Sequence, residues 1–216
     1  MSDRAVTRRA VLAAGSGAGV GLAAGAGRAL AQTPELTVTE ALMARRSTRQ
    51  FAPRGIDAQL RRRILWAAFG VNRPDVGGHT APSWRGANDA MVHVADDNGV
   101  GLYDPVADSV TMVLTQDIRA RLSPQPFVAT APLCLIHVSD LDRLTLAAGA
   151  PLPADEARLD AHVNAAVIAQ NVYLICAALG LGTCLVGGAD RAAIAAALGL
   201  GERRLVTYVQ PIGWPS

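Results

Sequence analysis

The sequence predicts a single α+β domain in which a central, mostly antiparallel sheet is flanked by helices. Residues 91–114 form three alternating stretches joined by tight turns, the pattern of an antiparallel meander. Residues 133–139 are almost continuously apolar, as expected of a central strand. Helical patterns precede and follow these strands, and a chain of 216 residues that is 50% apolar can bury one good core.

The first 31 residues predict an export signal and not a part of this fold. They contain a twin-arginine pair at 8–9, a run rich in alanine and glycine over 10–27, and a small-x-small cleavage site at 29–31. The alternative, a transmembrane anchor, is disfavoured because the run is weakly hydrophobic. Cleavage would leave one domain, residues 32–216, in a bacterial periplasm. The twin-arginine route exports folded proteins, which favours a chain that loads a cofactor before export.

Charge and composition exclude several classes of protein. All 20 basic residues are arginine, so no lysine can serve a P-loop, a Schiff base or general-base catalysis. The signal holds four arginines and one acid; without it 16 arginines face 17 acidic residues, a net charge of −1. We therefore expect no nucleic-acid surface. The four histidines are scattered without metal-ligand spacing, so no metal site is expected.

The first elements after the signal are two helices and a loop. Thr37 and Glu40 have capping-box spacing and predict a short helix to about Arg45. Asp57 caps a second helix that ends at Gly70. Residues 71–89 are rich in glycine, proline, asparagine and aspartate, which predicts an ordered loop with at most one helical turn.

The remaining elements follow in order along the chain. The meander has strands over 91–95, 101–104 and 109–114, then a short helix over 116–122 and a turn at 127–130. After the strand over 133–139, residues 140–158 are expected to be a flexible excursion. A long helix over 160–179, a strand over 183–186, a helix over 191–198 and a last strand over 205–212 complete the domain.

The long helix and the cysteines carry two further expectations. Residues 160–179 are apolar around nearly the whole helix, which predicts burial on all sides and hence packing against a second copy of the chain. Cys134, Cys176 and Cys184 lie in apolar runs and read as buried thiols. A disulfide between Cys176 and Cys184 stays open, because the periplasm is oxidising.

The stretch "ARRSTRQF" (44–51) is the main candidate for a binding site. Guanidinium groups of Arg45, Arg46 and Arg49 bind phosphate in a fork geometry, and Ser47 can add a hydroxyl donor. The alternative is a solvated charged surface. The glycines over 180–188 resemble a dinucleotide-binding fingerprint only loosely, because they precede a strand and do not follow one, so a Rossmann fold is rejected.

Four stretches, in this order, resemble motifs of the nitroreductase family of FMN-dependent flavoproteins. They are "RRSTRQF" (45–51), "APS" (81–83), "QPFVATAPLCLIHVSD" (125–140) and "QNVYLICAALGLGTCLVGG" (170–188). The run "LWAAFGVNRP" (65–74) is most similar to a compact subgroup related to azoline-oxidising peptide dehydrogenases. The resemblance implies a homodimeric flavoprotein fold for residues 32–216, with FMN as cofactor and no stable membrane anchor.

The resemblance also implies roles for the matched residues at the two ends of the cofactor. Arg45, Arg46 and Ser47 would hold the phosphate and ribityl end of FMN. Arg49 would reach N1 and O2 of the ring, where a fixed cation stabilises the negative charge that arrives on reduction.

The other matched residues would surround the ring. Leu185, Val186, Gly187 and Gly188 would follow its edge, with a backbone N–H near Gly187 donating to N5. Pro82 and Ser83 would come from the other subunit, since the family builds its two sites across the dimer interface. Gln125 would face the pyrimidine side of the ring.

The implied function is a ping-pong, two-electron oxidoreductase that acts through flavin N5 on a small organic substrate of the nitro, quinone or azoline type. Family members commonly use NAD(P)H, but a periplasm keeps no reduced nicotinamide pool, so a quinol or a redox partner is the alternative donor.

Two departures from the family pattern favour a second class, an exported FMN-binding subunit or interaction module with little turnover. Gly86 and Asn88 replace the usual Asn and Gln, and no cation follows the last strand. A cofactor-free α+β interaction domain is the third class.

Overall fold

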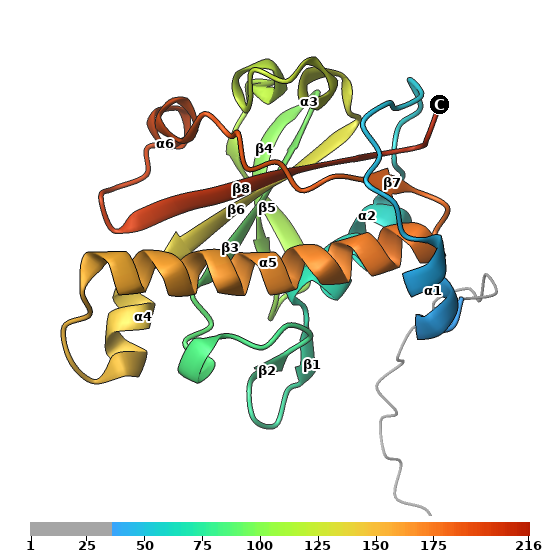
Figure 1. Cartoon of the computed structure of the whole chain (residues 1–216). Coiled ribbons are helices and arrows are strands. Elements are labelled where there is room, and N and C mark those ends of the chain that lie inside the picture. The colour runs from blue at the N-terminus through green and yellow to red at the C-terminus, as the bar shows by residue number, and fades with distance from the viewer. Residues whose placement is uncertain (1–35) are drawn as a thin grey trace, which may run out of the picture. The chain divides into compact units, whose positions relative to one another are not determined.

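The computed structural model describes residues 36–216, and the predicted signal at 1–31 lies outside them. A six-stranded sheet with the order β5-β4-β3-β6-β8-β7 forms the centre, and every pair of neighbouring strands in it is antiparallel. The long helix α5 lies across one face of this sheet, and α3 and α6 lie on the opposite side (Figure 1). The predicted α+β class with an antiparallel sheet is confirmed.

The bounds of the elements are as follows. The strands of the sheet are β3 Ala90–Asp96, β4 Gly99–Asp104, β5 Ser109–Leu114, β6 Leu133–Asp140, β7 Gly182–Thr183 and β8 Arg204–Gly213. The helices are α1 Val38–Ala44, α2 Ala58–Phe69, α3 Pro126–Thr130, α4 Leu141–Ala148, α5 Ala154–Ala178 and α6 Arg191–Leu198. Short 3₁₀ turns span Trp84–Gly86 and Arg119–Arg121, and a small hairpin joins β1 Val71–Arg73 to β2 Gly78–His79.

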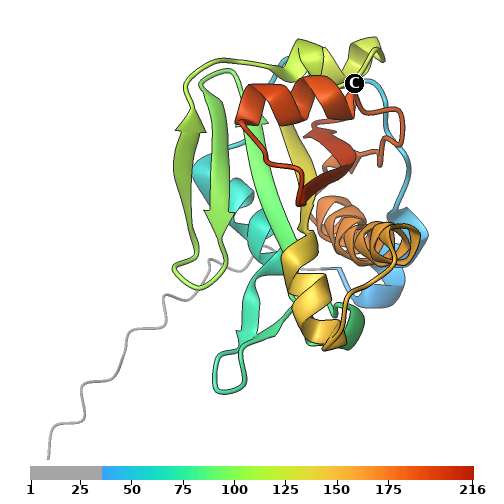
Figure 2. The ribbon, with the colours of Figure 1, turned by 90° about the vertical axis from the view of Figure 1, so that its left-hand side faces the viewer.

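The alternation of side chains along β6 divides the core into two layers. Leu133 and Leu135 point toward α2 and α5, whereas Cys134 and Ile136 point toward α3 and α6. All eight residues of β6 are buried, as the apolar pattern predicts for a central strand. In Figure 2 the strands spread across the view, α5 is seen nearly end-on and α6 lies at the top; the two helices pack against different layers of the core.

The predicted caps are present at the first two helices. The Thr37 side chain accepts a hydrogen bond from the Glu40 N–H at 3.2 Å, and Glu40 accepts one from the Thr37 N–H at 2.7 Å, which completes the capping box. Asp57 accepts a hydrogen bond from the Leu60 N–H at 2.8 Å at the start of α2. These local bonds fix where each helix begins.

Two of the loop predictions need correction. Residues 71–89 contain the β1–β2 hairpin in addition to the one expected helical turn. The helix predicted over 116–122 is reduced to a single 3₁₀ turn. There the Asp117 carboxylate accepts hydrogen bonds from both the backbone and the guanidinium of Arg119, and this local arrangement replaces a regular helical start.

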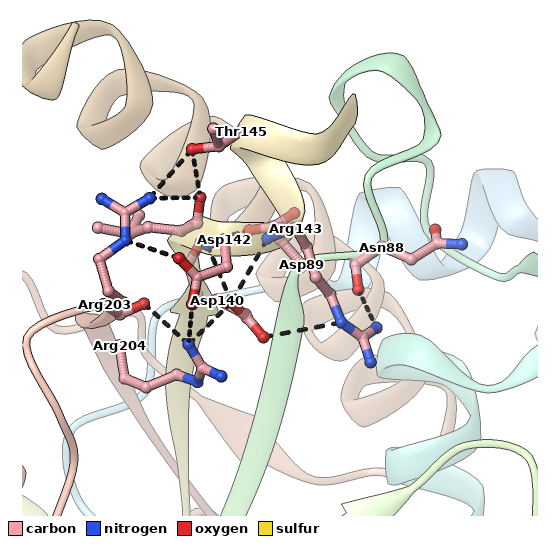
Figure 3. Close-up of polar contacts among 10 residues, drawn as sticks. Asn88, Asp89, Asp140, Asp142, Arg143, Thr145, Arg203 and Arg204 are labelled. Atoms are coloured by element: carbon pink, nitrogen blue, oxygen red, sulfur yellow. Dashed lines mark hydrogen bonds and ion pairs between the residues drawn. The ribbon is translucent and has the colours of Figure 1, made fainter. Parts of the chain in front are cut away.

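The prediction of a flexible excursion over 140–158 is wrong. Asp140 caps α4 by accepting hydrogen bonds from the N–H groups of Asp142 and Arg143, and Gly149 ends the helix at φ 71°. Two ion pairs hold α4 against the sheet (Figure 3). Arg203, just before β8, lies 2.7 Å from Asp142, and Arg204, the first residue of β8, lies 2.9 Å from Asp140. The segment is therefore an anchored helix.

Helix α5 begins at Ala154, six residues before the predicted start, and it is buried on one face only. Its buried residues recur at helical spacing and face the sheet, α1 and α2. On the outer face Leu159 and Val163 are exposed, so the expected burial on all sides is not found within one chain. In residues 36–216, α5 is the one helix long and apolar enough to span a membrane, yet here it packs across a sheet (Figure 1).

Candidate functional site

The segment that follows α1 is held along the end of the sheet. Ser47 forms a parallel bridge with Thr183, and the Thr48 N–H donates a hydrogen bond to the Thr183 carbonyl at 2.9 Å. Four residues later, Phe51 bridges to Pro215 near the C-terminus. The stretch that carries Arg45, Arg46, Ser47 and Arg49 is thus an irregular edge fixed to β7 and to the chain end.

The three arginines of this segment have no acidic partner within residues 36–216. Arg45 places its guanidinium 5.2 Å from the centre of the Tyr173 ring. Arg46 donates to the carbonyls of Met43 at 2.7 Å and Arg45 at 2.8 Å, which satisfies the end of α1 and leaves its Nη2 and Nε free of these bonds. Unneutralised like charges at this spacing repel one another, so an anion bound here would be favourable.

Tyr173 connects this segment to the loop after β7. Its hydroxyl lies 3.1 Å from Ser47 Oγ and accepts a hydrogen bond from the Leu185 N–H at 2.8 Å. The three residues come from the α1–α2 connection, from α5 and from the chain beyond β7. One side chain therefore brings together two of the stretches that sequence reasoning assigned to a single site.

The strand predicted over 183–186 pairs with β8 in a single register, although only Thr183 belongs to the regular strand β7 and Val186 to an isolated bridge. β7 stops at Thr183. The Cys184 N–H still donates to the Pro211 carbonyl at 3.4 Å, but Pro211 has no N–H to return a bond, and two-way pairing resumes where the Val186 N–H donates to the Val209 carbonyl at 2.8 Å. The two residues that follow this bridge, Gly187 and Gly188, are exposed.

Gly187 presents a free backbone donor. Its carbonyl accepts a hydrogen bond from Arg191 at 3.0 Å, whereas its N–H has no acceptor in the part of the chain that the structure describes. Open space surrounds the position where a Cβ would stand. A ligand can therefore approach this N–H closely, as the predicted backbone contact requires.

Gln125 lies beside the same loop. A Cβ on Gly188 would stand 3.3 Å from Gln125 Nε2, and Ser123 Oγ donates to the Gly188 carbonyl at 2.8 Å. A cavity of about 460 Å³ adjoins this contact and is lined in part by Arg121, Pro124 and Asp190. The structure thus places Gln125 beside Gly188, and its contact with a flavin ring stays a prediction.

Pro82 and Ser83 belong to a different part of the chain surface. Ser83 Oγ accepts from the Asn88 N–H at 2.8 Å and lies 3.3 Å from Asn88 Oδ1. This bond fits the positive φ of 47° at Asn88, an uncommon backbone conformation that an asparagine tolerates. The hydrogen bonds of the Ser83 side chain in residues 36–216 are with Asn88 and not with the arginines, so its role in the other subunit's site stays a prediction.

Sequence reasoning missed two residues of this region. The apolar pattern over 160–179 includes Tyr173, and its hydroxyl on an otherwise aliphatic stretch is the signal that distinguishes it. No motif marks Arg54, yet its guanidinium stacks 3.8 Å from the Trp214 ring centre, so a cation does lie beside the C-terminal strand.

Titratable groups elsewhere in the core carry no site of this kind. All three cysteines are free and buried, and burial raises the pKa of Cys134 to about 12. Within residues 36–216, no group of three or more histidine, cysteine or acidic side chains is placed to hold a metal ion.

Comparison with known proteins supplies relatives for this arrangement. Residues 42–214 match the family model described as "Nitroreductase family". The nitroreductase-like protein MJ1384 of Methanocaldococcus jannaschii is 32% identical over 164 residues, which cover 71% of this chain and 79% of that protein.

Solved structures show the same architecture. A nitroreductase-like protein of Ralstonia eutropha superposes with a TM-score of 0.79 at 32% identity and covers 86% of each chain. The NADPH:FMN oxidoreductase of Vibrio harveyi, at 22% identity and a TM-score of 0.62, covers 83% of this chain and 69% of that one, and shows a shared fold.

Proposed function

Because the chain belongs to the nitroreductase family of oxidoreductases, we propose that it binds FMN and transfers two electrons to a small organic substrate. The observation that carries this proposal is the link between Arg45, Ser47 and Leu185 through Tyr173. It joins arginines that have no acidic partner among residues 36–216 to a loop where, in the same residues, the Gly187 N–H has no acceptor. A phosphate and a planar ring on one ligand would use both ends.

The residues present fit such a cofactor. Arg45 and Ser47 are available to a phosphate, and Arg46 can add the donors that α1 does not use. The open space beside Gly187 admits a ring edge, and the neighbouring Gln125 amide can bond to polar ring atoms. Pro82 and Ser83 of the partner subunit would complete the site.

Bound FMN would supply hydride acceptance at N5 in a ping-pong cycle. The chain's own contributions are orientation and charge. The hydrogen bond from Arg191 to the Gly187 carbonyl holds Gly187 in place, and the Gly187 N–H would donate at N5. Arg49 would hold a positive charge beside the pyrimidine end of the ring. No side chain of the site has to act as an acid or a base.

We propose that the site is formed by a homodimer. Val38, Leu42 and Met43 of α1, Trp66 of α2, and Leu159 and Val163 of α5 expose large apolar side chains. A groove of about 250 Å³ between these helices is lined mainly by apolar residues, among them Leu174 and Ile175. Exposed apolar side chains beside an apolar groove mark an interface, and a second copy would cover them.

The electron donor follows from the proposed export. A periplasmic enzyme would meet no maintained NAD(P)H pool, so we propose a quinol or a redox protein as donor, or operation as an oxidase of a reduced substrate. Mixing the purified protein anaerobically with NADH, NADPH or a reduced quinone and following the flavin absorbance distinguishes these. Fast bleaching by NADPH alone would contradict the proposed donor.

One experiment tests the function itself. The chain without residues 1–31 is purified, its visible spectrum is recorded, and the cofactor released by acid is quantified per chain. The proposal expects flavin absorbance bands, close to one FMN per chain, and reversible bleaching by a chemical reductant. A colourless protein that takes up no added FMN would overturn it. A yellow protein that no donor reduces would support the FMN-holding subunit, which the departures at Gly86 and Asn88 favour.

A further inference from the structure

The hydroxyl of Tyr173 stands between two loops and has a defined hydrogen-bond direction. The Leu185 N–H can only donate, so the Tyr173 oxygen is the acceptor of that 2.8 Å bond. The single phenolic proton is then available to Ser47 Oγ, 3.1 Å away. When Ser47 Oγ accepts the hydrogen bond from the Tyr173 hydroxyl, the hydroxyl proton of Ser47 is free to point toward another acceptor.

The free proton of Ser47 is well placed for an anion. Ser47 is exposed, and its neighbours Arg45 and Arg46 have no acidic partner in the chain from 36 to 216. The Tyr173 ring also supports the Arg45 guanidinium at 5.2 Å without neutralising its charge. Tyr173 therefore contacts a cation, a hydroxyl donor and a backbone N–H at once.

We propose that Tyr173 is a positioning residue that couples the two ends of the cofactor site. Its hydroxyl orients Ser47 as a donor toward a phosphate and fixes Leu185, from which the backbone leads to the Gly187 N–H. This inference rests on the proposed function, because the phosphate and the ring belong to the proposed FMN. Tyr173 itself need not touch the cofactor.

The hydroxyl and the ring of Tyr173 can be separated by mutation. Tyr173→Phe keeps the ring under Arg45 and removes both hydrogen bonds of the hydroxyl. Tyr208→Phe is the matched control, since Tyr208 is half-buried on β8 and its ring packs edge-on against His162, away from this site. Apoprotein of each variant is titrated with FMN and with riboflavin, which lacks the phosphate, and the thermal midpoint is recorded.

Tyr173→Phe should raise the Kd for FMN about tenfold, the equivalent of one hydrogen bond of roughly 1.4 kcal/mol. The Kd for riboflavin should rise less, because riboflavin has no phosphate for Ser47 to bind. The FMN-to-riboflavin preference therefore falls, a result that a general loss of stability would not give. The visible spectrum of the bound flavin should also shift, since the loop that carries Gly187 is released. Tyr208→Phe should change neither.

Ser47→Ala supplies a second route that does not depend on how Tyr173→Phe folds. It should lower the same preference, and adding Tyr173→Phe to it should lower the preference no further, because both act on one proton. Wild type that binds no FMN would overturn the proposed function and this inference together. Wild type that binds FMN, with an unchanged preference in Tyr173→Phe or fully additive losses in the double variant, would overturn the inference alone.

Discussion

Gly182 lies so close to Thr48 that a Cβ added to it would stand 2.6 Å from both Cβ and Oγ1 of Thr48. Thr48 is short and β-branched, so it cannot turn aside. Gly182→Ala should therefore push the arginine segment away from β7, at a cost of about 1–3 kcal/mol in the free energy of unfolding. Urea denaturation measures this loss, and FMN affinity should fall with it.

Gly201→Ala is the control for that substitution. A Cβ at Gly201 meets nothing within 4 Å. The change should alter the free energy of unfolding by less than about 1 kcal/mol and leave FMN affinity as it is. If both variants behaved alike, the contact between β7 and the arginine segment would not matter for the site.

Arg45→Ala and Arg49→Ala should affect different properties of a bound flavin. Arg45→Ala removes a cation from the phosphate end and should raise the Kd for FMN roughly 10- to 100-fold, the range of a charge-assisted hydrogen bond. Arg49→Ala removes the charge beside the ring and should mainly lower the flavin potential and slow its reduction, on the order of tenfold. Fluorescence titration and anaerobic redox titration measure the two effects.

Arg73→Ala, in the exposed β1–β2 hairpin, is the matched control for removal of an arginine. It should change neither the Kd nor the potential. Equal effects of Arg45→Ala and Arg49→Ala on both properties would contradict the proposed division between the two ends of the cofactor.

The three cysteines should be unreactive in the native protein and titrate as thiols after unfolding. Each is buried, and burial raises the pKa of Cys134 to about 12 and also raises the pKa of Cys176, so the reactive thiolate is scarce near neutral pH. Ellman's reagent should react with native Cys134 roughly a thousandfold more slowly than with a free thiol. Finding one thiol and not three in denaturant without reductant would reveal a Cys176–Cys184 disulfide.

Local signals account for the elements that the sequence predicts well. Thr37 and Asp57 cap their helices within three residues, and the turn at Asp97 to Gly99 joins two strands directly. Helix α4 carries similar signals, an aspartate before it and a glycine after it. The prolines that follow favour a loop, and the anchors of the helix, Arg203 and Arg204, lie about 60 residues away in the sequence.

The candidate site could be predicted in its residue types but not in its connections. Arginines close together suggest an anion, and glycines suggest a close backbone approach, whatever the fold. The bridge from Ser47 to Thr183 and the bond from Ser47 to Tyr173 join residues more than 100 positions apart in the sequence. The bond from Leu185 to Tyr173 joins a loop to a helix, and no local spacing encodes any of these contacts. Arg54 beside Trp214 is a contact of the same long-range kind.

Asp89 is a buried carboxyl whose charge should make the fold less stable as pH rises. It accepts hydrogen bonds from Ser139 and from Asn164. Even so, burial raises its pKa, and the nearby Asp140 adds to the effect. Because the folded pKa lies above the unfolded one, the native state holds the proton more tightly. The stability contributed by this group therefore falls as pH rises from the unfolded-state pKa to the folded-state pKa. The pKa of neighbouring Asp160 is raised as well, by burial and by the charge on Asp89.

Asp89→Asn tests this directly, since an amide keeps the shape, can bond to both partners and carries no charge. At pH 7 the variant should unfold at a higher urea concentration than wild type, and the advantage should shrink as pH falls through the raised pKa of the Asp89 carboxyl. Asp142→Asn is the opposite control: hydrogen bonds from Arg203 and then Arg204 lower the pKa of that carboxyl, so its loss should not stabilise the protein at pH 7. A pH-independent difference between Asp89→Asn and wild type would mean that Asp89 is not the group that titrates.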